Sequence, residues 1–342
     1  MKNSNRWSVR RRLGVGLLIV LALVLVVVGY LAAVPPDVSH LASHPNPAAN
    51  YAEAAQRVAA IQAQEATGYN PLCHTQLLTH GQKTARAIAF IHGYTNCPNQ
   101  FLQLGQQFYD LGYNVLLVPM PQQGLLDVMT REPSKLTAEE MITYTDQLVD
   151  ILRGLGDRTS VAGLSQGGVL AGWAAQTRGD LDQAVLIAPG FGLKLIPTPV
   201  TVLATNLVLG LPEIYRWWGH LERNDFPPQP AQDPHGVQGY PIFSLHGLAQ
   251  QLRLGIATQA LARRTAPAAH SIVVVTNGAD LSVENSVTDL VVADWRAHGA
   301  TDITTYQFPF GLQLDHDMID PHRDDQHVDL VYPKLIELIN TK

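Results

Sequence analysis

The chain has 342 residues, of which 46% are hydrophobic and 15% charged. That composition supplies a sizeable core and excludes a disordered protein. The formal net charge is −6, but five of the 23 basic residues precede the first acidic one, Asp37, so the rest of the chain carries 18 basic against 29 acidic residues, a net −11. A body this acidic argues against a nucleic-acid partner, whose phosphates need basic surface. The five early basic residues are Lys2, Arg6, Arg10, Arg11 and Arg12.

The chain opens with a basic head, residues 1–12, followed by 22 uncharged residues from Leu13 to Val34. About 20 such residues span a bilayer as a helix, so we predict a transmembrane anchor over 13–34. A cleaved signal peptide is the alternative, although its apolar region is normally shorter. Basic residues before the span predict a single-pass membrane protein with its N-terminus in the cytoplasm and the domain after the span outside.

Residues 35–50 are rich in Pro, Ser and Asn and are typical of a linker. Residues 51–67 have helical spacing. The chain contains two cysteines, Cys73 and Cys97. An even count in an oxidising compartment permits one disulfide, and two unrelated small residues are the alternative. No zinc-type cysteine cluster is present.

From about residue 86 short apolar runs alternate with segments of helical spacing, which predicts a parallel sheet with helices on both faces. We therefore treat residues 51–342 as one α/β domain. Strands are expected at 87–93, 113–121, 159–165, 182–189, 271–280 and 302–310, and helices at 99–112, 137–156, 166–179, 247–265, 286–299 and 329–340. Thr137 and Glu140 form a capping-box pattern at the start of one helix.

The alternation breaks at about residues 190–246, a long apolar segment that we interpret as an inserted cap with helices of its own. Its apolar residues suit an acyl chain, ordinary packing on the body, or contact with a bilayer surface; the sequence leaves all three open. Leu193, Leu195, Ile196, Val200, Val202, Leu203, Leu207, Val208, Leu209, Leu211, Trp217 and Trp218 carry this character.

The stretch "GLSQGG" falls between a predicted strand and a predicted helix, which is the context that a serine nucleophile requires. Ser165 is its centre, and Gly163 and Gly167 are the small neighbours that such a sharp turn needs. A serine hydroxyl is a weak nucleophile unless a base removes its proton. The sequence therefore predicts a nearby histidine and an acid that orients it.

His316 follows the last predicted strand, and Asp280 follows the strand before it. The order Ser165, Asp280, His316 matches that of serine hydrolases whose nucleophile lies on a sharp strand-to-helix turn. Glu284 is the alternative acid. The acidic run "DHDMIDPHRDDQH" fits no zinc or calcium pattern, so we expect no metal, and we expect Asp317 and Asp320 to support the loop that carries His316.

Developing charge on the substrate oxygen needs two N–H donors. Gln166, the residue after the nucleophile, is expected to supply one. The other is expected from Tyr94 in the loop "HGYTNCP", where Gly93 permits a tight turn. His92 in the same loop is a rival base, but its position favours a structural hydrogen bond.

The stretches "HGYTNCPNQF", "GLSQGG", "NGAD" and "DHDMIDP" resemble the α/β-hydrolase superfamily, nearest to its bacterial carboxylesterase and monoacylglycerol-lipase-like members, from about residue 70 to 342. The resemblance implies an eight-stranded, mostly parallel sheet with a cap after the strand "AVLIAP". Such proteins often carry a Pro-Gly-His-Gly stretch where this chain reads Pro121-Gln122-Gln123-Gly124.

The sequence thus predicts a membrane-anchored carboxylic ester hydrolase that needs no cofactor and acts on a small acyl ester or lipid. An acyltransferase or thioesterase on the same triad is the alternative. An anchored binding protein is a further one, and it predicts a broken triad. The sequence leaves the oligomeric state open.

Overall fold

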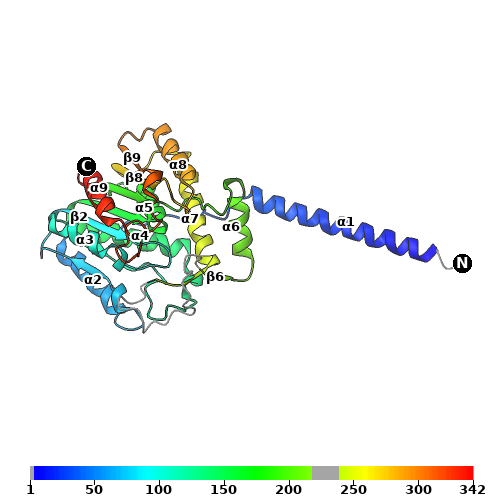
Figure 1. The fold of residues 1–342 in the computed structure, drawn as a ribbon, viewed down its shortest axis with the longest axis horizontal. Helices are drawn as coiled ribbons and strands as arrows, with labels where there is room; N and C mark the ends of the chain where they lie inside the picture. Colours follow the sequence, from blue (N-terminus) through cyan, green and yellow to red (C-terminus); the bar gives the residue numbers. More distant parts are fainter. Residues whose placement is uncertain (1–3, 218–238, 342) are drawn as a thin grey trace.

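The computed structural model describes residues 4–217 and 239–341, with side chains from residue 11 onward. Two predictions fall partly outside this described part. They are the basic head, for the side chains of Lys2, Arg6 and Arg10, and the cap, from Trp218 to residue 238. A long helix, α1 (Ser4–Ala33), projects from a body built around a sheet (Figure 1). Its segment Arg11–Ala33 is long and apolar enough to cross a membrane, a test that a signal sequence near the N-terminus also passes.

The segment 35–50 is held on the body by hydrogen bonds to helix α4 (Ala138–Leu155). The Asn46 N–H donates to the carboxylate of Asp150 at 3.0 Å, and the Ala48 N–H donates to its carbonyl at 2.9 Å. The Asp150 carboxylate also accepts from the fully buried Arg178 guanidinium at 2.6 Å. The connection between α1 and the body is therefore an ordered part of the fold, followed by α2 (Tyr51–Gln64), which packs on α4.

Seven described strands form one sheet in the order β1-β3-β2-β4-β5-β8-β9, with β1 antiparallel to β3 and the others parallel. The register places Phe90 opposite Ala162, and Val161 opposite Ala184. We expected eight strands; in the described residues, the chain before β1 forms a 3₁₀ turn at Pro71–Cys73 instead. The strands are β1 (Gln76–Leu78), β2 (Thr84–Ile91), β3 (Asn114–Leu117), β4 (Gly156–Leu164), β5 (Gln183–Ile187), β8 (Ser271–Asn277) and β9 (Ile303–Phe308).

Helices cover both faces of the sheet, as the alternating pattern predicts. Helices α3 (Asn99–Asp110) and α9 (Val328–Asn340) pack on one face. Helices α4, α5 (Gln166–Thr177) and α8 (Asn285–Ala297) pack on the other. Successive residues of β2 and β5 alternate between these two apolar cores, because side chains of a strand alternate between its faces. The capping box of α4 is confirmed: the Glu140 N–H donates to Thr137 Oγ1 at 3.1 Å.

The described part of the cap contains a 3₁₀ turn (Thr198–Val200), helix α6 (Thr201–Gly210) and a two-stranded ribbon of β6 (Tyr215–Trp217) and β7 (Ile242–Ser244). The chain then enters α7 (Leu245–Ala262), which packs on α5 and on α6. Further 3₁₀ turns lie at Glu132–Lys135 and Phe310–Leu312. Helix α6 lies beside the end of α1, on the side of the body from which α1 projects (Figure 1).

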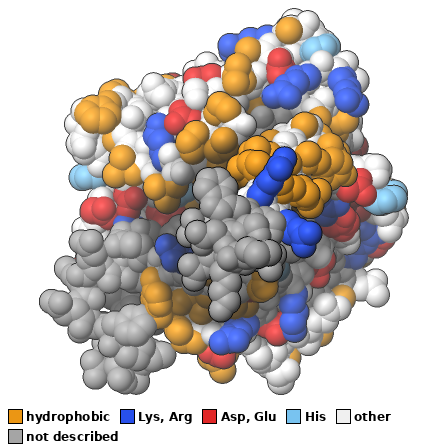
Figure 2. Space-filling view, turned by 90° about the vertical axis from the view of Figure 1, so that its right-hand side faces the viewer, with side chains coloured by type: hydrophobic (Ala, Val, Ile, Leu, Met, Phe, Trp, Pro, Cys, Tyr) orange, Lys and Arg blue, Asp and Glu red, His pale blue; other side chains and the backbone are white. Residues whose placement is uncertain are grey.

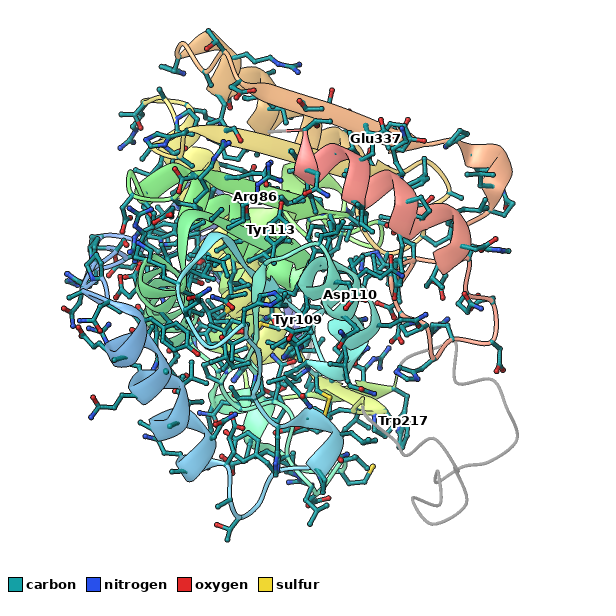
Figure 3. The ribbon with its side chains drawn as sticks, turned by 90° about the vertical axis from the view of Figure 1, so that its left-hand side faces the viewer. Arg86, Tyr109, Asp110, Tyr113, Trp217 and Glu337 are labelled. Atoms are coloured by element: carbon teal, nitrogen blue, oxygen red, sulfur yellow. A yellow bond between two sulfur atoms is a disulfide. The ribbon has the colours of Figure 1, made fainter. Side chains whose placement is uncertain are left out.

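The opposite side of the body carries a structural polar contact. Arg86 of β2 donates to the Tyr113 hydroxyl at 2.9 Å, and both side chains bond Asn340 of α9. Figure 3 shows Arg86 and Tyr113 close together on this side. These bonds tie α9 to the sheet, so we assign Arg86, Tyr113 and Asn340 a structural role.

Candidate active site

Ser165 lies at the turn that joins β4 to α5. Its backbone has φ 56° and ψ −110°, a conformation that non-glycine residues rarely adopt and that characterises a strained functional turn. Its N–H donates to the Ile187 carbonyl at 2.9 Å, and its own carbonyl accepts from Gly190 at 3.0 Å. The turn is therefore fixed by the adjoining strand, and Ser165 remains partly exposed at its tip.

The two glycines that flank this turn have no room for a side chain. A Cβ on Gly163 would lie 2.1 Å from the Gly167 carbonyl oxygen, and a Cβ on Gly167 would lie 2.1 Å from that of Ile91. Both distances are far inside van der Waals contact, and both neighbours are backbone atoms. The requirement for glycine here comes from close backbone approach, since neither residue has a positive φ.

Asp280 and His316 meet at the ends of β8 and β9. His316 Nδ1 lies 2.8 Å from Asp280 Oδ2, and the other oxygen of Asp280 accepts the N–H groups of Ser282 and Val283 at 2.8 and 3.0 Å. Asp280 is completely buried and the His316 side chain is 13% exposed. Glu284, the alternative acid, instead caps α8 through Ser286 and pairs with Lys194 at 3.1 Å.

The environment sets the ionisation of this pair. Burial works against the charged imidazolium, but the charge and hydrogen bond of Asp280, with smaller contributions from Asp317 and Asp315, raise the pKa of His316 to about 8. Burial also works against the charged carboxylate, yet His316 and the two backbone N–H groups hold the pKa of Asp280 below its usual range. Asp280 therefore remains an anion that orients His316 through Nδ1, which leaves Nε2 as the ring nitrogen available for proton transfer.

The loop after β2 approaches the start of α5. Gln166 is the first residue of α5 and is fully buried, and Tyr94 is 8% exposed. The Tyr94 hydroxyl donates to the Ser244 carbonyl at 3.0 Å, so this side chain is tied to the cap. The positive φ of the loop falls on Thr95 (65°), whereas Gly93 has no positive φ and a Cβ there would make ordinary contacts at 3.6 Å or more. We expected Gly93 to permit the tight turn. The left-handed backbone conformation lies at Thr95 instead, so the turn does not require a glycine at position 93.

Several solved structures share this architecture. One of the metagenome-derived lipolytic enzymes LipS and LipT aligns with 80% of this chain and 100% of its own, at 16% identity and a TM-score of 0.53. The monoacylglycerol lipase of Paleococcus ferrophilus covers 75% and 95%, at 18% identity and 0.54. The monoglyceride lipase of Saccharomyces cerevisiae, a soluble variant with a substrate analogue, covers 78% and 91%, at 13% identity and 0.58. The chain has the α/β-hydrolase fold. No family model matches the sequence, and no curated protein matches it.

In this fold, Asn277 joins the loop after β8, which carries Asp280, to the loop after β9, which carries His316. Its side-chain amide donates to the carbonyls of Leu314 and Asp315 at 2.8 and 3.1 Å, and its Oδ1 accepts the Ala279 N–H at 3.0 Å. One side chain at the end of β8 therefore positions both catalytic candidates. Sequence reasoning missed this role because the contacts join loops almost 40 residues apart.

The loop after β9, which carries His316, is also hydrogen-bonded to the start of α3 and to the loop before it. Gln100 accepts the Gly93 N–H at 2.9 Å and donates to Asp317 at 3.3 Å, while Asn96 donates to the buried Asp320 at 3.1 Å. Asp317 and Asp320 thus support the His316 loop through one partner in the "HGYTNCP" loop, Asn96, and one just after it, Gln100. Gln100 was not among the expected site residues, because nothing in its local sequence marks it.

Gln123 links the two loops from which we expect the N–H donors. Its Oε1 accepts the Thr95 N–H at 2.8 Å, and its Nε2 donates to Gln166 Oε1 at 3.0 Å. Both glutamine side chains are fully buried. Gln123 stands in the "PQQG" stretch, where the sequence departs from the pattern that the resemblance implied, and that departure was the available signal of its role.

His92 is buried, with both ring nitrogens occupied. Nδ1 lies 2.8 Å from the Gly93 carbonyl, and Nε2 accepts the Met120 N–H at 2.9 Å. Burial lowers the pKa of His92 to about 4. His92 is therefore neutral and structural, and it has no free nitrogen with which to act as a base.

The acidic run around His316 is balanced by Arg323, which pairs with Asp315 and lies 3.9 Å from Asp317 and 3.4 Å from Asp325. Within residues 4–217 and 239–341, no group of three or more His, Cys, Asp or Glu side chains could hold a metal ion. The arrangement supports acid–base chemistry at His316.

Cys73 and Cys97 are joined by a disulfide. Cys97 directly follows Asn96 of the loop described above, and a Cβ on Gly124 would lie 3.1 Å from Cys73 Cβ. The disulfide therefore holds the chain before β1 against the "HGYTNCP" loop and the "PQQG" stretch.

The cap is bonded to the same loop. The Tyr240 N–H donates to the Thr95 carbonyl at 2.7 Å, and the Tyr240 hydroxyl accepts the Leu125 N–H at 2.7 Å. The cap thus reaches the loop after β2 through a main-chain bond as well as through Tyr94.

Proposed function

We propose that the protein is a membrane-anchored serine hydrolase that cleaves carboxylic esters of acyl or lipid type, with Ser165 as nucleophile, His316 as base and Asp280 as the acid that orients it. The observation that carries the proposal is the 2.8 Å hydrogen bond between His316 Nδ1 and Asp280 Oδ2. The strained turn of Ser165 in an α/β-hydrolase fold supports it. The relatives in that fold are lipolytic by their names.

The mechanism follows from these residues. Neutral His316 removes the Ser165 proton through Nε2 while Oγ bonds to the acyl carbon, and Asp280 stabilises the imidazolium that forms. The N–H groups of Gln166 and Tyr94 donate to the oxyanion of the tetrahedral intermediate. His316 then returns the proton to the leaving alkoxide, which leaves an acyl-enzyme on Ser165. Water, deprotonated by His316, attacks the acyl carbon, and His316 then gives that proton to Ser165 Oγ as the acid is released.

The cap supports an acyl or lipid substrate. Its helix α6 carries apolar side chains over most of its length and has no charged residue. Burial of an acyl chain against such surface is favourable at about 0.8 kcal/mol per methylene group. The cap is hydrogen-bonded to the loop of the proposed oxyanion donor Tyr94, which supports a role beside the reacting ester.

Helix α1 supports membrane anchoring, because its apolar stretch has the length of a bilayer core. The basic residues at its start support a cytoplasmic N-terminus and an extracytoplasmic body, and the disulfide is compatible with an oxidising compartment. Protease added to intact cells should reach the body if no further membrane surrounds it. Access only after the inner membrane is breached would contradict this orientation.

Turnover of p-nitrophenyl esters of graded chain length tests the reaction. The wild-type protein should hydrolyse them, and Ser165→Ala should lose about 10⁶-fold in kcat while keeping its fold. Ser282→Ala is the matched control, because that exposed serine serves Asp280 only through its main-chain N–H.

Two results would redirect the proposal. Turnover that requires an added alcohol would indicate an acyltransferase, and thioester turnover without ester turnover would indicate a thioesterase. Absence of any turnover in folded wild-type protein would contradict the proposed catalysis.

A further inference from the structure

Helix α6 is largely apolar, yet most of its residues are only partly buried. Its sequence TVLATNLVLG has no charged residue, and among its ten residues only Thr205 is fully buried. An all-round apolar helix is normally enclosed by protein or by a membrane. At about 1.5 Å per residue, ten residues are too few to cross a bilayer. The partly exposed apolar side chains of α6 therefore call for an apolar medium that α6 can enter without spanning it.

Large apolar side chains on both sides of α6 in the sequence extend this surface. Leu195 is 93% exposed, Val200 41%, Leu211 54% and Ile214 51%. We call α6 together with these four residues the cap face. Strand β6 follows it with the sequence Tyr-Arg-Trp, a mixture of aromatic and basic residues that is typical of membrane interfaces.

Asn206 of α6 binds the end of α1. Its side-chain amide donates to the carbonyls of Leu31 and Val34, both at 2.8 Å. Within a helix, the Leu31 carbonyl would accept from the N–H of residue 35, but that residue is Pro35, which has no N–H. Asn206 therefore supplies the donor that the end of α1 lacks. An unsatisfied carbonyl would be costly at the edge of a bilayer.

This contact fixes the depth of the cap face relative to α1. The apolar run of α1 ends at Val34, and the first charged residue after it is Asp37. The Asn206 bonds thus lie where α1 leaves the hydrocarbon region. Helix α6 runs across the end of α1 (Figure 1), so it lies along the plane of a membrane that α1 crosses. Figure 2 looks onto this side of the molecule and shows hydrophobic side chains in several groups on it.

We propose that the cap face is immersed in the interfacial region of the same bilayer that α1 spans, with Asn206 joining the two. The proposal rests on the membrane anchoring proposed above. A lipid surface fits better than a second protein, because the bond to α1 already holds α6 at the depth of the lipids. The cap would then contact lipids directly and offer them a route toward the catalytic loops.

Depth measurements on the full-length protein in phosphatidylcholine nanodiscs test this. Both native cysteines are in the disulfide, so one introduced cysteine can carry an NBD fluorophore. Leu211→Cys and Ile214→Cys report on the cap face. Val20→Cys reports on α1, and Leu290→Cys, on the exposed surface of α8 and similarly exposed at 53%, is the control.

Lipids that carry a nitroxide near the headgroup should quench the Leu211 and Ile214 probes and leave the Leu290 probe bright. Lipids with a deep nitroxide should quench Val20. If Val20 is quenched while Leu211 and Ile214 behave like Leu290, the cap-face proposal is overturned and the anchor stands. Probes shielded from water but untouched by either nitroxide would show a protein partner, which also overturns it. An unquenched Val20 overturns the anchoring on which it rests; ester turnover of the same samples reads the catalysis separately.

Asn206→Asp tests the joint itself, because the carboxylate has nearly the same shape but no N–H to donate. We expect loss of headgroup quenching at Ile214, with quenching at Val20 unchanged. Gln326→Glu is the control, since this exposed amide acts as an acceptor for Val328 and keeps that contact. Unchanged quenching at Ile214 in Asn206→Asp would contradict the role of Asn206.

Discussion

The turn around Ser165 and the cap face follow opposite rules of construction. At the turn, two glycines touch backbone atoms, and the main chain of Ser165 is bonded on both sides. On the cap face, the four apolar side chains that flank α6 are 41% to 93% exposed. Helix α6 itself packs against α7 and the end of α1. The body therefore fixes the main chain at Ser165, whereas the cap presents apolar side chains that are at least partly exposed. Substitutions in the body should affect all substrates alike, and substitutions in the cap should affect chain-length preference.

The largest effect is expected from the glycines of the turn. Gly163→Ala or Gly167→Ala places a Cβ 2.1 Å from a backbone oxygen, which forces the turn apart, so we expect destabilisation above about 4 kcal/mol and loss of folded protein. Gly93→Ala is the control, with ordinary contacts at 3.6 Å or more. Denaturant unfolding and yield measure both. Wild-type stability in Gly163→Ala would show that the turn is not packed as described.

The next largest effect is expected at the acid. Asp280→Asn keeps the shape of the side chain but removes the charge that orients His316, so kcat should fall by about 10⁴-fold for esters of every chain length. Glu284→Gln changes only the N-cap residue of helix α8 and its ion pair with Lys194, so kcat should stay near wild type. Steady-state kinetics on short and long esters compare them. A larger loss in Glu284→Gln than in Asp280→Asn would exchange their roles.

A smaller effect is expected at Gln123, which acts through other residues. Gln123→Ala removes the acceptor of the Thr95 N–H and the donor to Gln166 Oε1, and a shift of the donor loop should lower kcat by about 10²-fold with KM little changed. Gln122→Asn is the neighbouring control and tolerates the positive φ of 62° at that position. A change in KM alone would place Gln123 in substrate binding instead.

The smallest effect concerns pH. Because the pKa of His316 is raised from 6.5 to about 8, its charged form stabilises the fold by about 2 kcal/mol below pH 6.5, and this stabilisation is lost as the pH rises through 8. Activity needs the neutral form, so it should rise over the same range while stability falls. The rate of labelling by a fluorophosphonate measures the pH dependence of activity, and denaturant unfolding measures that of stability. Asp280→Asn should move the midpoint of labelling down toward 6.5; an unmoved midpoint would mean that another group titrates.

The sequence predicts the parts of this molecule that depend on local patterns. The strand and helix around Ser165, the capping box at Thr137 and the alternation along the sheet are all local features, and the structure confirms each. The pairing of His316 with Asp280 could be proposed because parallel strands end at one edge of the sheet.

The rest depends on contacts between distant segments. Gln123, Gln100 and Asn277 act through side-chain amides whose partners lie on other loops, and an isolated Asn or Gln carries no sign of its partner. The same applies to Asn206, whose partners on α1 are more than 170 residues away. The eighth strand was expected from resemblance alone, while this chain places a disulfide-bonded turn before β1.

The site of covalent modification by a fluorophosphonate tests the central claim most directly. Peptide mass spectrometry of labelled wild-type protein should locate the adduct on Ser165, at a rate that Asp280→Asn reduces and Glu284→Gln does not. Folded Ser165→Ala protein should remain unmodified. An adduct on another residue, or equal labelling of Ser165→Ala, would contradict the assignment of Ser165 as the nucleophile.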